Sequence, residues 1–208
     1  MGPEDSKAPF LRIPWAASLL KRPNIITRVP RSRRLKRSGE DSLFADTLKT
    51  SRTLRSCVAF YQRPTPDQKM IEEISTLITL GDGVNGHQDI MHGGIVAAIL
   101  DEAMGILQDA NMERDHLSAV RLGHAEGELP SNPTSYTREL KITYLKPVQT
   151  PGSLIATARI VKRDGRKEWL SAEIKQREGV VEDYDGEEVV CAKAEALFIE
   201  PRPVRSKL

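Results

Sequence analysis

The chain has 208 residues, of which 39% are hydrophobic and 29% are charged, and its formal net charge is +2. These values are those of an ordinary globular protein with one sizeable domain and an extension, and no apolar run is long enough to cross a membrane. The two cysteines, Cys57 and Cys191, are not spaced as metal ligands, and the four histidines are dispersed. We therefore expect free thiols in a reducing compartment and no metal site.

The near-zero net charge hides a basic N-terminal segment. Residues 1–40 hold ten lysines and arginines against three acidic residues, a net charge of +7, and five prolines that break any long helix. We expect an arm rather than a domain, in which Pro14–Leu20 forms a short helix that lays Trp15, Leu19 and Leu20 on another surface. The run Arg31–Arg37 could bind nucleic acid or an anionic membrane, but we favour a solvated linker because no aromatic residue interleaves with the charges.

A compact domain is expected from residue 41 to residue 204, with its core between residues 69 and 199. Asp41 or Ser42 can cap a short helix that runs through Leu48. The segment Arg52–Tyr61 is assigned to a second helix, which ends at the prolines that follow. Residues 69–80 then have the character of a strand and end at two glycines.

The stretch from Asn85 to Leu107 organises the rest of the chain. Residues 95–107 include ten apolar residues and no proline, and the apolar residues fall on all sides at helical spacing, so they predict a buried helix. Gly93 and Gly94 at its start leave backbone N–H groups uncovered. Together with the helix dipole, these donors can hold an oxygen that becomes negative.

Two carboxylates, Asp101 and Glu102, stand in the middle of this helix. A carboxylate on an apolar helix is costly unless it is paired, hydrated or functional. Neighbouring helical residues point about 100° apart, so we do not expect both side chains to face the same groove. We assign catalysis to Asp101 and a solvated or interface position to Glu102.

The C-terminal part of the chain is predicted to be sheet. Residues 109–134 are polar and contain prolines and glycines, which indicates a loop in which Ser118–Leu122 could form a short strand. A hairpin turn is expected at residues 164–165. The expected strands are Tyr136–Leu145, Leu154–Val161, Glu168–Gln176 and Val189–Ile199. This order predicts an α+β fold, and a helix this apolar needs a curved antiparallel sheet wrapped around it.

This order of elements, with His92-Gly93-Gly94 at the start of a buried helix and Asp101 nine residues after the histidine, resembles the hotdog-fold acyl-CoA thioesterases. The likeness covers residues 69–199 and points to the branch of the phenylacetate-pathway (PaaI-type) enzymes and the human thioesterase superfamily members. Asn85-Gly86-His87-Gln88 looks like the PaaI-type lead-in, and Leu140–Pro147 looks like the strand after the helix. Asn85 lies seven residues before His92, where that family usually has six.

The resemblance implies hydrolysis of an acyl-CoA thioester, and the residues allow the same chemistry. The Gly93 N–H can polarise the thioester carbonyl and hold its oxyanion, while Asp101 can act as general base on water or attack directly. Thr137 lies where the family places a water-orienting Ser or Thr. Asn85 could assist the carbonyl, and His92 could help the leaving thiolate or brace the turn.

Further residues are candidates for substrate contact. Gly94 and His87 lie beside the expected thioester position, with a simple loop role as the alternative for His87. Met91 and Met104, with Leu107 and residues of a partner chain, are expected to line the acyl pocket. No cofactor is expected, because coenzyme A is part of the substrate, but its phosphates need cations. The candidates flank the hairpin turn, where a solvated tip is the alternative, and they are Lys162, Arg163, Arg166 and Lys167.

The geometry of the helix indicates that the site needs two chains. Gly93 and Asp101 are eight residues apart, which is about 12 Å at 1.5 Å per residue. A base and its water must lie within about 3 Å of each other. Two antiparallel helices related by a two-fold axis can bring one Gly93 to the other Asp101. We therefore expect a homodimer with two sites, which the resemblance also implies and which could assemble into a tetramer.

The C-terminal residues 205–208 predict a cellular address. Ser206-Lys207-Leu208 matches the tripeptide that a peroxisomal import receptor reads, and Pro201 and Pro203 would keep this end extended. We expect a peroxisomal protein, with the cytoplasm or the mitochondrion as alternatives.

Two other functions remain open. A hotdog enoyl-CoA hydratase or dehydratase would share the fold, but the D-x-N-P-x-H pattern or the His/Glu pair that such enzymes usually show is absent. A non-catalytic acyl-CoA-binding protein would not need Asp101 together with both glycines. The sequence does not define the acyl chain.

Overall fold

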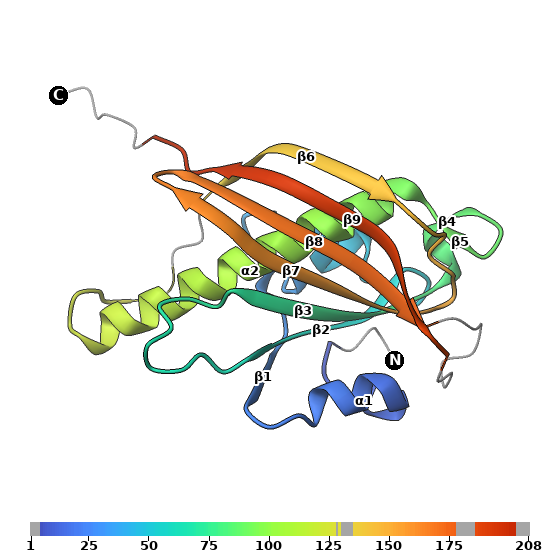
Figure 1. Cartoon of the computed structure of the whole chain (residues 1–208), viewed down its shortest axis with the longest axis horizontal. Coiled ribbons are helices and arrows are strands. Elements are labelled where there is room, and N and C mark those ends of the chain that lie inside the picture. The colour runs from blue at the N-terminus through green and yellow to red at the C-terminus, as the bar shows by residue number, and fades with distance from the viewer. Residues whose placement is uncertain (1–4, 128, 130–134, 178–185, 203–208) are drawn as a thin grey trace.

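A computed structural model describes residues 5–127, 129, 135–177 and 186–202 of the chain. A seven-stranded antiparallel sheet, with strands in the order β1-β2-β3-β7-β8-β9-β6, curves around one long helix, α2 (Figure 1). A two-stranded hairpin, β4 and β5, lies just before α2. The predicted α+β architecture is thereby confirmed. The elements are α1 (Pro14–Leu20), β1 (Ile25–Arg28), β2 (Leu54–Gln62), β3 (Glu73–Leu80), β4 (Asn85–His87), β5 (Ile90–Met91), α2 (Gly93–Arg121), β6 (Tyr136–Tyr144), β7 (Gly152–Asp164), β8 (Lys167–Arg177) and β9 (Glu188–Ile199).

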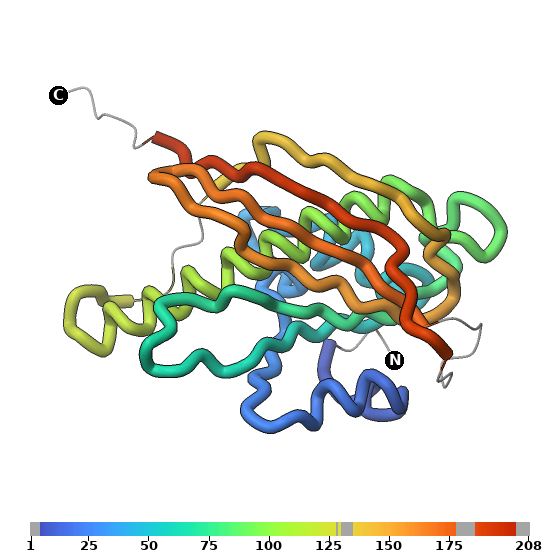
Figure 2. The backbone as a smooth tube through the Cα atoms, in the orientation of Figure 1, coloured from blue at the N-terminus to red at the C-terminus, as the bar shows by residue number. Residues whose placement is uncertain are grey.

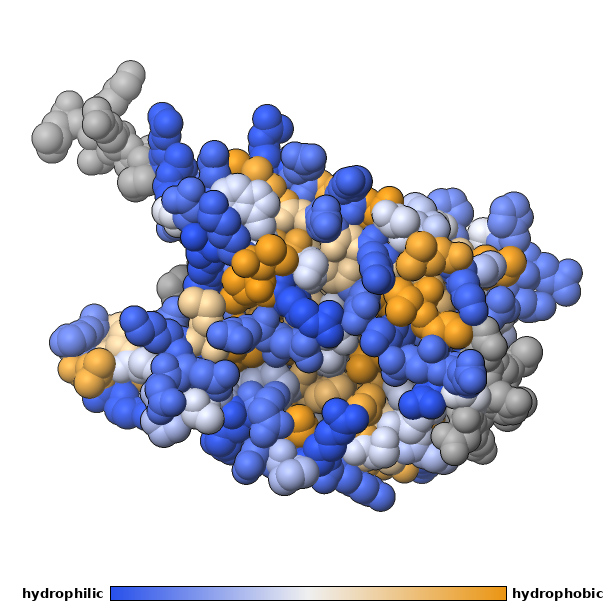
Figure 3. Space-filling view, viewed as in Figure 1, coloured by the Kyte–Doolittle hydropathy of each residue, from blue (hydrophilic) through white to orange (hydrophobic). Residues whose placement is uncertain are grey.

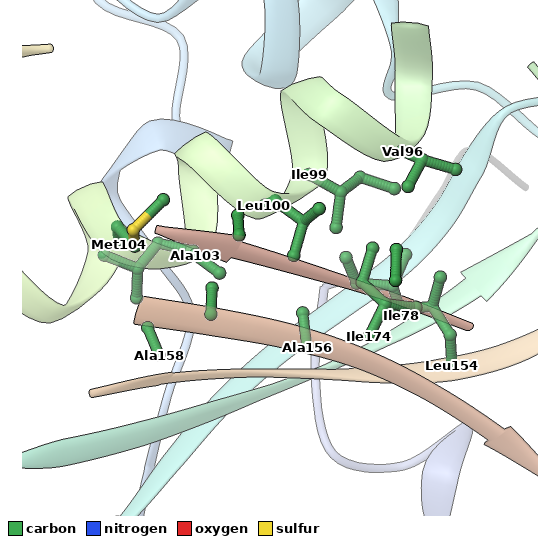
Figure 4. Close-up of a cluster of buried hydrophobic side chains, with 14 of the residues drawn as sticks. Ile78, Val96, Ile99, Leu100, Ala103, Met104, Leu154, Ala156, Ala158 and Ile174 are labelled. Atoms are coloured by element: carbon green, nitrogen blue, oxygen red, sulfur yellow. The ribbon is translucent and has the colours of Figure 1, made fainter. Parts of the chain in front are cut away.

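The main core lies between α2 and the concave face of the sheet. Val96, Leu100, Ala103 and Leu107 recur at helical spacing and are almost fully buried. Figure 4 shows the side chains of this helix pointing toward those of β3, β7 and β8. The inner faces of β7, β8 and β9 carry mostly small residues, which let the helix approach the sheet closely. These are Ala156, Ala158, Ala172, Ala192, Ala194 and Ala196.

Strand β2 is buried on both of its faces. Cys57 and Ala59 belong to the core under α2, whereas Val58 and Phe60 pack on the opposite side against the N-terminal residues around α1. The assignment of Arg52–Tyr61 to a helix is therefore wrong. Burial on both faces removes the polar–apolar alternation that marks a half-exposed strand, and the resulting apolar run cannot be told from a helix by periodicity.

The N-terminal arm is folded against the domain. The predicted helix Pro14–Leu20 is present, and Trp15 is buried on the outer face of the sheet. The chain then forms β1, which pairs with β2, and passes on to α2 (Figure 2). Arg31 bonds Asp109 of α2 at 2.9 Å, and Arg33 is 2% exposed, so the expectation of a solvated linker is wrong for these residues. Both guanidiniums are held by carboxylates that lie far away in the sequence.

Two segments outside the strands also differ from expectation. Helix α2 continues to Arg121, so residues 109–121 are not a loop and Ser118–Leu122 is not a strand. These residues are polar because the end of the helix is largely exposed. The helix ends just before Gly123, whose φ of +73° favours glycine. The short helix predicted after residue 41 is present as a π-helix at Leu43–Thr47, although Ser42 makes no side-chain capping bond. No helix in the described part of the chain is both long and apolar enough to span a bilayer.

Candidate active site

The turn before α2 is built around His92. Its Nδ1 accepts a hydrogen bond from the Gly94 N–H at 3.0 Å, so the histidine caps the helix with its own side chain. A Cβ on Gly86 would lie 2.9 Å from the His92 Cα, which explains why glycine stands there. The Tyr144 hydroxyl donates to the Gly93 carbonyl at 3.0 Å. His92 therefore braces the turn, and no protein group among the described residues bonds the Gly93 N–H.

Asp101 and Thr137, both candidates from the sequence, lie next to each other in the structure. The Thr137 hydroxyl donates to the Asp101 carboxylate at 2.9 Å. Asp101 is partly buried, and this burial raises the pKa of its carboxyl, while the bond from Thr137 opposes the rise. The carboxylate thus has a fixed orientation and a proton affinity shifted toward that of a useful base.

One chain does not bring Gly93 and Asp101 to the same point. Tyr144, near one end of β6, contacts Gly93, whereas Thr137, near the other end, contacts Asp101. Seven residues of strand separate these two positions, about 23 Å at 3.3 Å per residue. Gly93 and Gly94 are exposed, and β6 is an edge strand whose outer side pairs with no strand in the described chain.

A cavity of about 230 Å³ opens beside Asp101. On the side of α2, residues at helical spacing form two adjacent rows of the cavity wall. One row is Asp101, Gly105, Gln108 and Met112, and the other is Glu102, Ile106 and Asp109. The expectation that these carboxylates face different surroundings is wrong, because the cavity is wide enough to span both rows. The lining residues are Arg31, Ser32, Lys36, Glu40, Asp41, Asp101, Glu102, Gly105, Ile106, Gln108, Asp109, Met112, Ser135, Thr137 and Phe198.

Glu102 is neither solvated nor free. It accepts a hydrogen bond from the Ser32 hydroxyl of the arm, and the arm covers this side of the helix. Burial is the main cause that raises the pKa of Glu102, to about 7, and the bond from Ser32 opposes it. Of the two positions expected for Glu102, the solvated one is wrong, because that expectation left the arm out of the fold; Glu102 lies where the arm meets α2.

Because the pKa of Glu102 is raised, we expect the free energy of unfolding to depend on pH through this residue. A carboxyl that binds its proton more tightly in the folded chain stabilises the fold fully at low pH and loses that contribution as the pH rises through about 7. The ionised carboxylate should cost on the order of 3 kcal/mol at pH 8. We expect Glu102→Gln to raise Tm at pH 8 by roughly 5 °C or more and to change it little at pH 5. Thermal unfolding followed by circular dichroism at both pH values measures this, with Glu195→Gln on the exposed face of β9 as control.

The basic residues of the β7–β8 hairpin divide into two groups. Arg163, Arg166 and Lys167 line a second cavity of about 310 Å³, which shares lining residues with the cavity beside Asp101. It lies between the hairpin and the C-terminal half of α2, where the space-filling view is hollowed (Figure 3). Lys162 instead stacks on Trp169, with its Nζ 5.1 Å from the ring centroid. Three of the four predicted cations therefore flank one space.

Four other predicted residues have different surroundings. The Asn85 side-chain oxygen accepts a hydrogen bond from the Thr150 hydroxyl, and His87 is exposed on β4. Met91 and Met104 are at most 4% exposed and belong to the main core. Neither methionine lines the cavity beside Asp101. Their expected role in an acyl pocket shared with a partner chain stays a prediction. Met104 lies off the two helix rows that face the cavity.

The contribution of the arm to this site was missed. Arg31, Ser32 and Lys36 all line the cavity. The contacts of Arg31 and Ser32 with α2 join residues 70 or more positions apart. No local pattern in the sequence marks such a contact; the basic run was the sole available signal. Among the described residues, no group of three or more His, Cys, Asp or Glu side chains could hold a metal ion.

Comparison with known proteins shows a family match over part of the chain. A model of the thioesterase superfamily matches residues 88–182, which extend from the turn before α2 through β8. Verlamelin biosynthesis protein B of a Lecanicillium species is 28% identical over 196 residues, which cover 83% of this chain and 78% of that protein. An uncharacterised protein of Schizosaccharomyces pombe is 29% identical over 118 residues, which cover 56% of this chain and 53% of that protein.

Two solved structures resemble parts of the chain. A Bacillus halodurans protein solved with CoA is 25% identical, with 63% of this chain and 69% of that chain covered and a TM-score of 0.41. A thioesterase family protein from Silicibacter pomeroyi is 18% identical, with 68% and 82% covered and a TM-score of 0.46. Residues 88–182 match the thioesterase superfamily, and the chain carries the hotdog fold, in which a sheet wraps one long helix. The match of residues 88–182 supports thioester hydrolysis as the general class of reaction.

Proposed function

We propose that the protein is an acyl-CoA thioesterase that hydrolyses a thioester to a free acid and coenzyme A. The observation that carries the proposal is Asp101, a partly buried carboxylate on an apolar helix. It is oriented by Thr137 and faces a cavity. The thioesterase superfamily match includes this helix and strand. Hydrolysis needs a base or nucleophile held in this way beside room for an acyl group.

The reaction can be written with the groups of this chain. Asp101 takes a proton from water as the water oxygen forms a bond to the thioester carbon. The Gly93 N–H of a partner chain donates to the carbonyl oxygen as it becomes negative. The C–S bond then breaks, the acid is released, and the thiolate of coenzyme A takes up a proton. In the alternative route Asp101 attacks the carbon itself, the C–S bond breaks and the thiolate of coenzyme A leaves and takes up a proton. Water then hydrolyses the resulting anhydride, which releases the acid and restores Asp101.

A panel of acyl-CoAs tests this function directly. Release of free thiol should be seen with at least one member and should follow saturation kinetics. Binding without thiol release would instead indicate an acyl-CoA-binding protein, and water addition to an enoyl-CoA without thiol release would indicate a hydratase. Arg163, Arg166 and Lys167 are proposed to contact the phosphates of coenzyme A, since these side chains line the neighbouring cavity.

A site shared between two chains is the next proposal. Gly93 and Asp101 of one chain contact opposite ends of β6, and the free edge of β6 lies beside the exposed start of α2. An isologous dimer through this edge would bring each Gly93 to the Asp101 of its partner. Association of two such dimers into a tetramer is compatible with this arrangement.

Subunit mixing should reveal the shared site. Asp101→Asn chains and Gly93→Val chains should each be inactive alone, and a mixed dimer should regain one intact site of its two. Gly93→Val should still fold, because a Cβ at this position meets Tyr144 at an ordinary contact distance of 3.6 Å. Thiol release is measured after subunit exchange, which a pair of fluorescent labels can verify. Full activity in a monomer, or no recovery after proven exchange, would rule out the shared site.

The cellular address is also a proposal. Ser206, Lys207 and Leu208 lie outside the described residues, and their sequence matches a peroxisomal import signal. A fluorescent protein fused to the N-terminus should enter peroxisomes, and removal of Leu208 should leave it in the cytosol. If the intact fusion never reaches peroxisomes, the cytoplasm or the mitochondrion becomes the better assignment.

A further inference from the structure

The cavity beside Asp101 is lined mainly by polar residues. Eleven of its fifteen lining residues have polar or charged side chains, and several of them come from the arm and the segment that follows it. Pockets for small molecules are usually lined by apolar side chains with a few polar groups. Behind the cavity, next to Glu102, lies an apolar void of only about 10 Å³. A plain alkyl chain therefore finds little apolar wall here within one chain.

The charges in this lining are unequal. Five acidic residues stand against two cations, and both cations are paired: Arg31 with Asp109, and Lys36 with Glu40 and Asp41. Neither Asp101 nor Glu102 forms an ion pair within the described chain, although the charge of Arg33 attracts the Glu102 carboxylate. The cavity is therefore unsuited to an acyl group with a second carboxylate, because like charges in a partly buried site repel each other.

Glu102 offers one position for a neutral hydrogen-bonding group. One of its carboxylate oxygens accepts from the Ser32 hydroxyl, and the other has no partner among the described residues. Because the pKa of Glu102 is raised to about 7, its carboxyl can accept a hydrogen bond or donate one near neutral pH. An alcohol has both functions, so it can bond this group in either protonation state.

We propose that this cavity is a subsite for an acyl chain that carries a hydroxyl group, which Glu102 and Ser32 bind. The proposal rests on the proposed thioesterase function and names its substrate class. A plain acyl chain in the same place would displace water from Glu102 and leave its second oxygen without a partner. Sites built to bind a hydroxyl discriminate strongly against analogues that lack it, since a buried polar group is then left unpaired.

Matched substrates of one chain length test the subsite. The panel consists of a plain medium-chain acyl-CoA, a series with one hydroxyl at successive carbons, and the acyl-CoA with a terminal carboxylate. With the wild-type protein, kcat/KM for the best hydroxyacyl-CoA should exceed that for the plain acyl-CoA on the order of 10-fold to 100-fold. The carboxylated substrate should be the poorest of the three.

Two variants link the preference to the named residues. Ser32→Ala and Glu102→Leu should lower kcat/KM for the hydroxyacyl-CoA and raise it for the plain one, so that the preference approaches unity. Glu195→Gln, on the exposed outer face of β9, is the control and should keep the wild-type preference. Unfolding curves establish that each variant is folded.

The outcomes separate this proposal from the function on which it rests. Thiol release with equal or better kcat/KM for the plain chain at every hydroxyl position overturns the hydroxyl subsite and leaves the thioesterase standing. A preference that survives in both variants also overturns the assignment to Ser32 and Glu102. If no acyl-CoA is hydrolysed, the thioesterase proposal fails, and calorimetric dissociation constants decide the subsite. Equal constants for the plain and hydroxylated chains then overturn it.

Discussion

Asp101→Asn should lower kcat by on the order of 10²-fold or more, because the amide can neither take a proton from water nor attack the thioester. The substitution keeps an oxygen for the hydrogen bond from Thr137, which is 2.9 Å long in the structure, so the geometry of the site should persist. KM should change little. Steady-state thiol release over a range of acyl-CoA concentrations measures both constants.

The pH profile and a control variant complete this test. Because burial raises the pKa of Asp101, the wild-type kcat/KM should fall on the acidic side at a pH above the value near 3.9 of an ordinary aspartate. Asp67→Asn makes the same chemical change in an exposed loop and should leave turnover unaltered. A folded Asp101→Asn protein with wild-type turnover would remove Asp101 from the mechanism.

Arg33→Met should destabilise the protein by about 3–5 kcal/mol, the usual cost of removing one partner of a buried ion pair. The Arg33 guanidinium bonds the Asp5 carboxylate at 3.0 Å and the carbonyls of Phe44 and Leu54 at 2.9 Å. Methionine has a similar length but no donors, so Asp5 would lose its arginine, and both carbonyls would lose a bond. The expected fall in Tm is about 10 °C.

The neighbouring Arg34 provides a matched control for this prediction. It is exposed, so Arg34→Met should change Tm by no more than about 2 °C. The pair of variants tests whether the arm is packed against the domain. If it were not packed, both substitutions would change Tm by the same small amount. A double-mutant cycle with Asp5→Asn would then measure the coupling across the ion pair.

Helices and strands were predictable from the sequence where they are buried on all sides or have one buried and one exposed face. The buried helix was recognised from apolar residues on all its sides, and the strands after it were recognised from their alternation and turn residues. Strand β2 was mistaken for a helix because one of its faces packs under α1 and the other under α2. The end of α2 was mistaken for a loop because its exposed residues are polar, and polarity alone does not distinguish an exposed helix from a loop.

The residues of the candidate site also differ in how far the sequence predicts their surroundings. Asp101 was a candidate because of its spacing from His92, and Thr137 because of the family resemblance; the two bond each other in the structure. Glu102 could not be placed, since its surroundings depend on Ser32, which lies 70 residues away. Long-range contacts of this kind leave no local pattern in the sequence. Because of them, a carboxylate that was expected to be solvated lines a cavity instead.

The distant partners of the arm have a consequence for synthesis on the ribosome. Residues 5–33 emerge first, but Glu102 and Asp109, which hold Ser32 and Arg31, are made 70 and 78 residues after them. The outer core around Phe10 and Trp15 is completed by Ile155, far later still. Contacts between residues so far apart carry a high loop-closure cost and form slowly. The apolar residues of the nascent arm therefore stay exposed until the later residues have been synthesised. Any fragment that ends before α2 lacks the carboxylates that bind Arg28, Arg31 and Ser32.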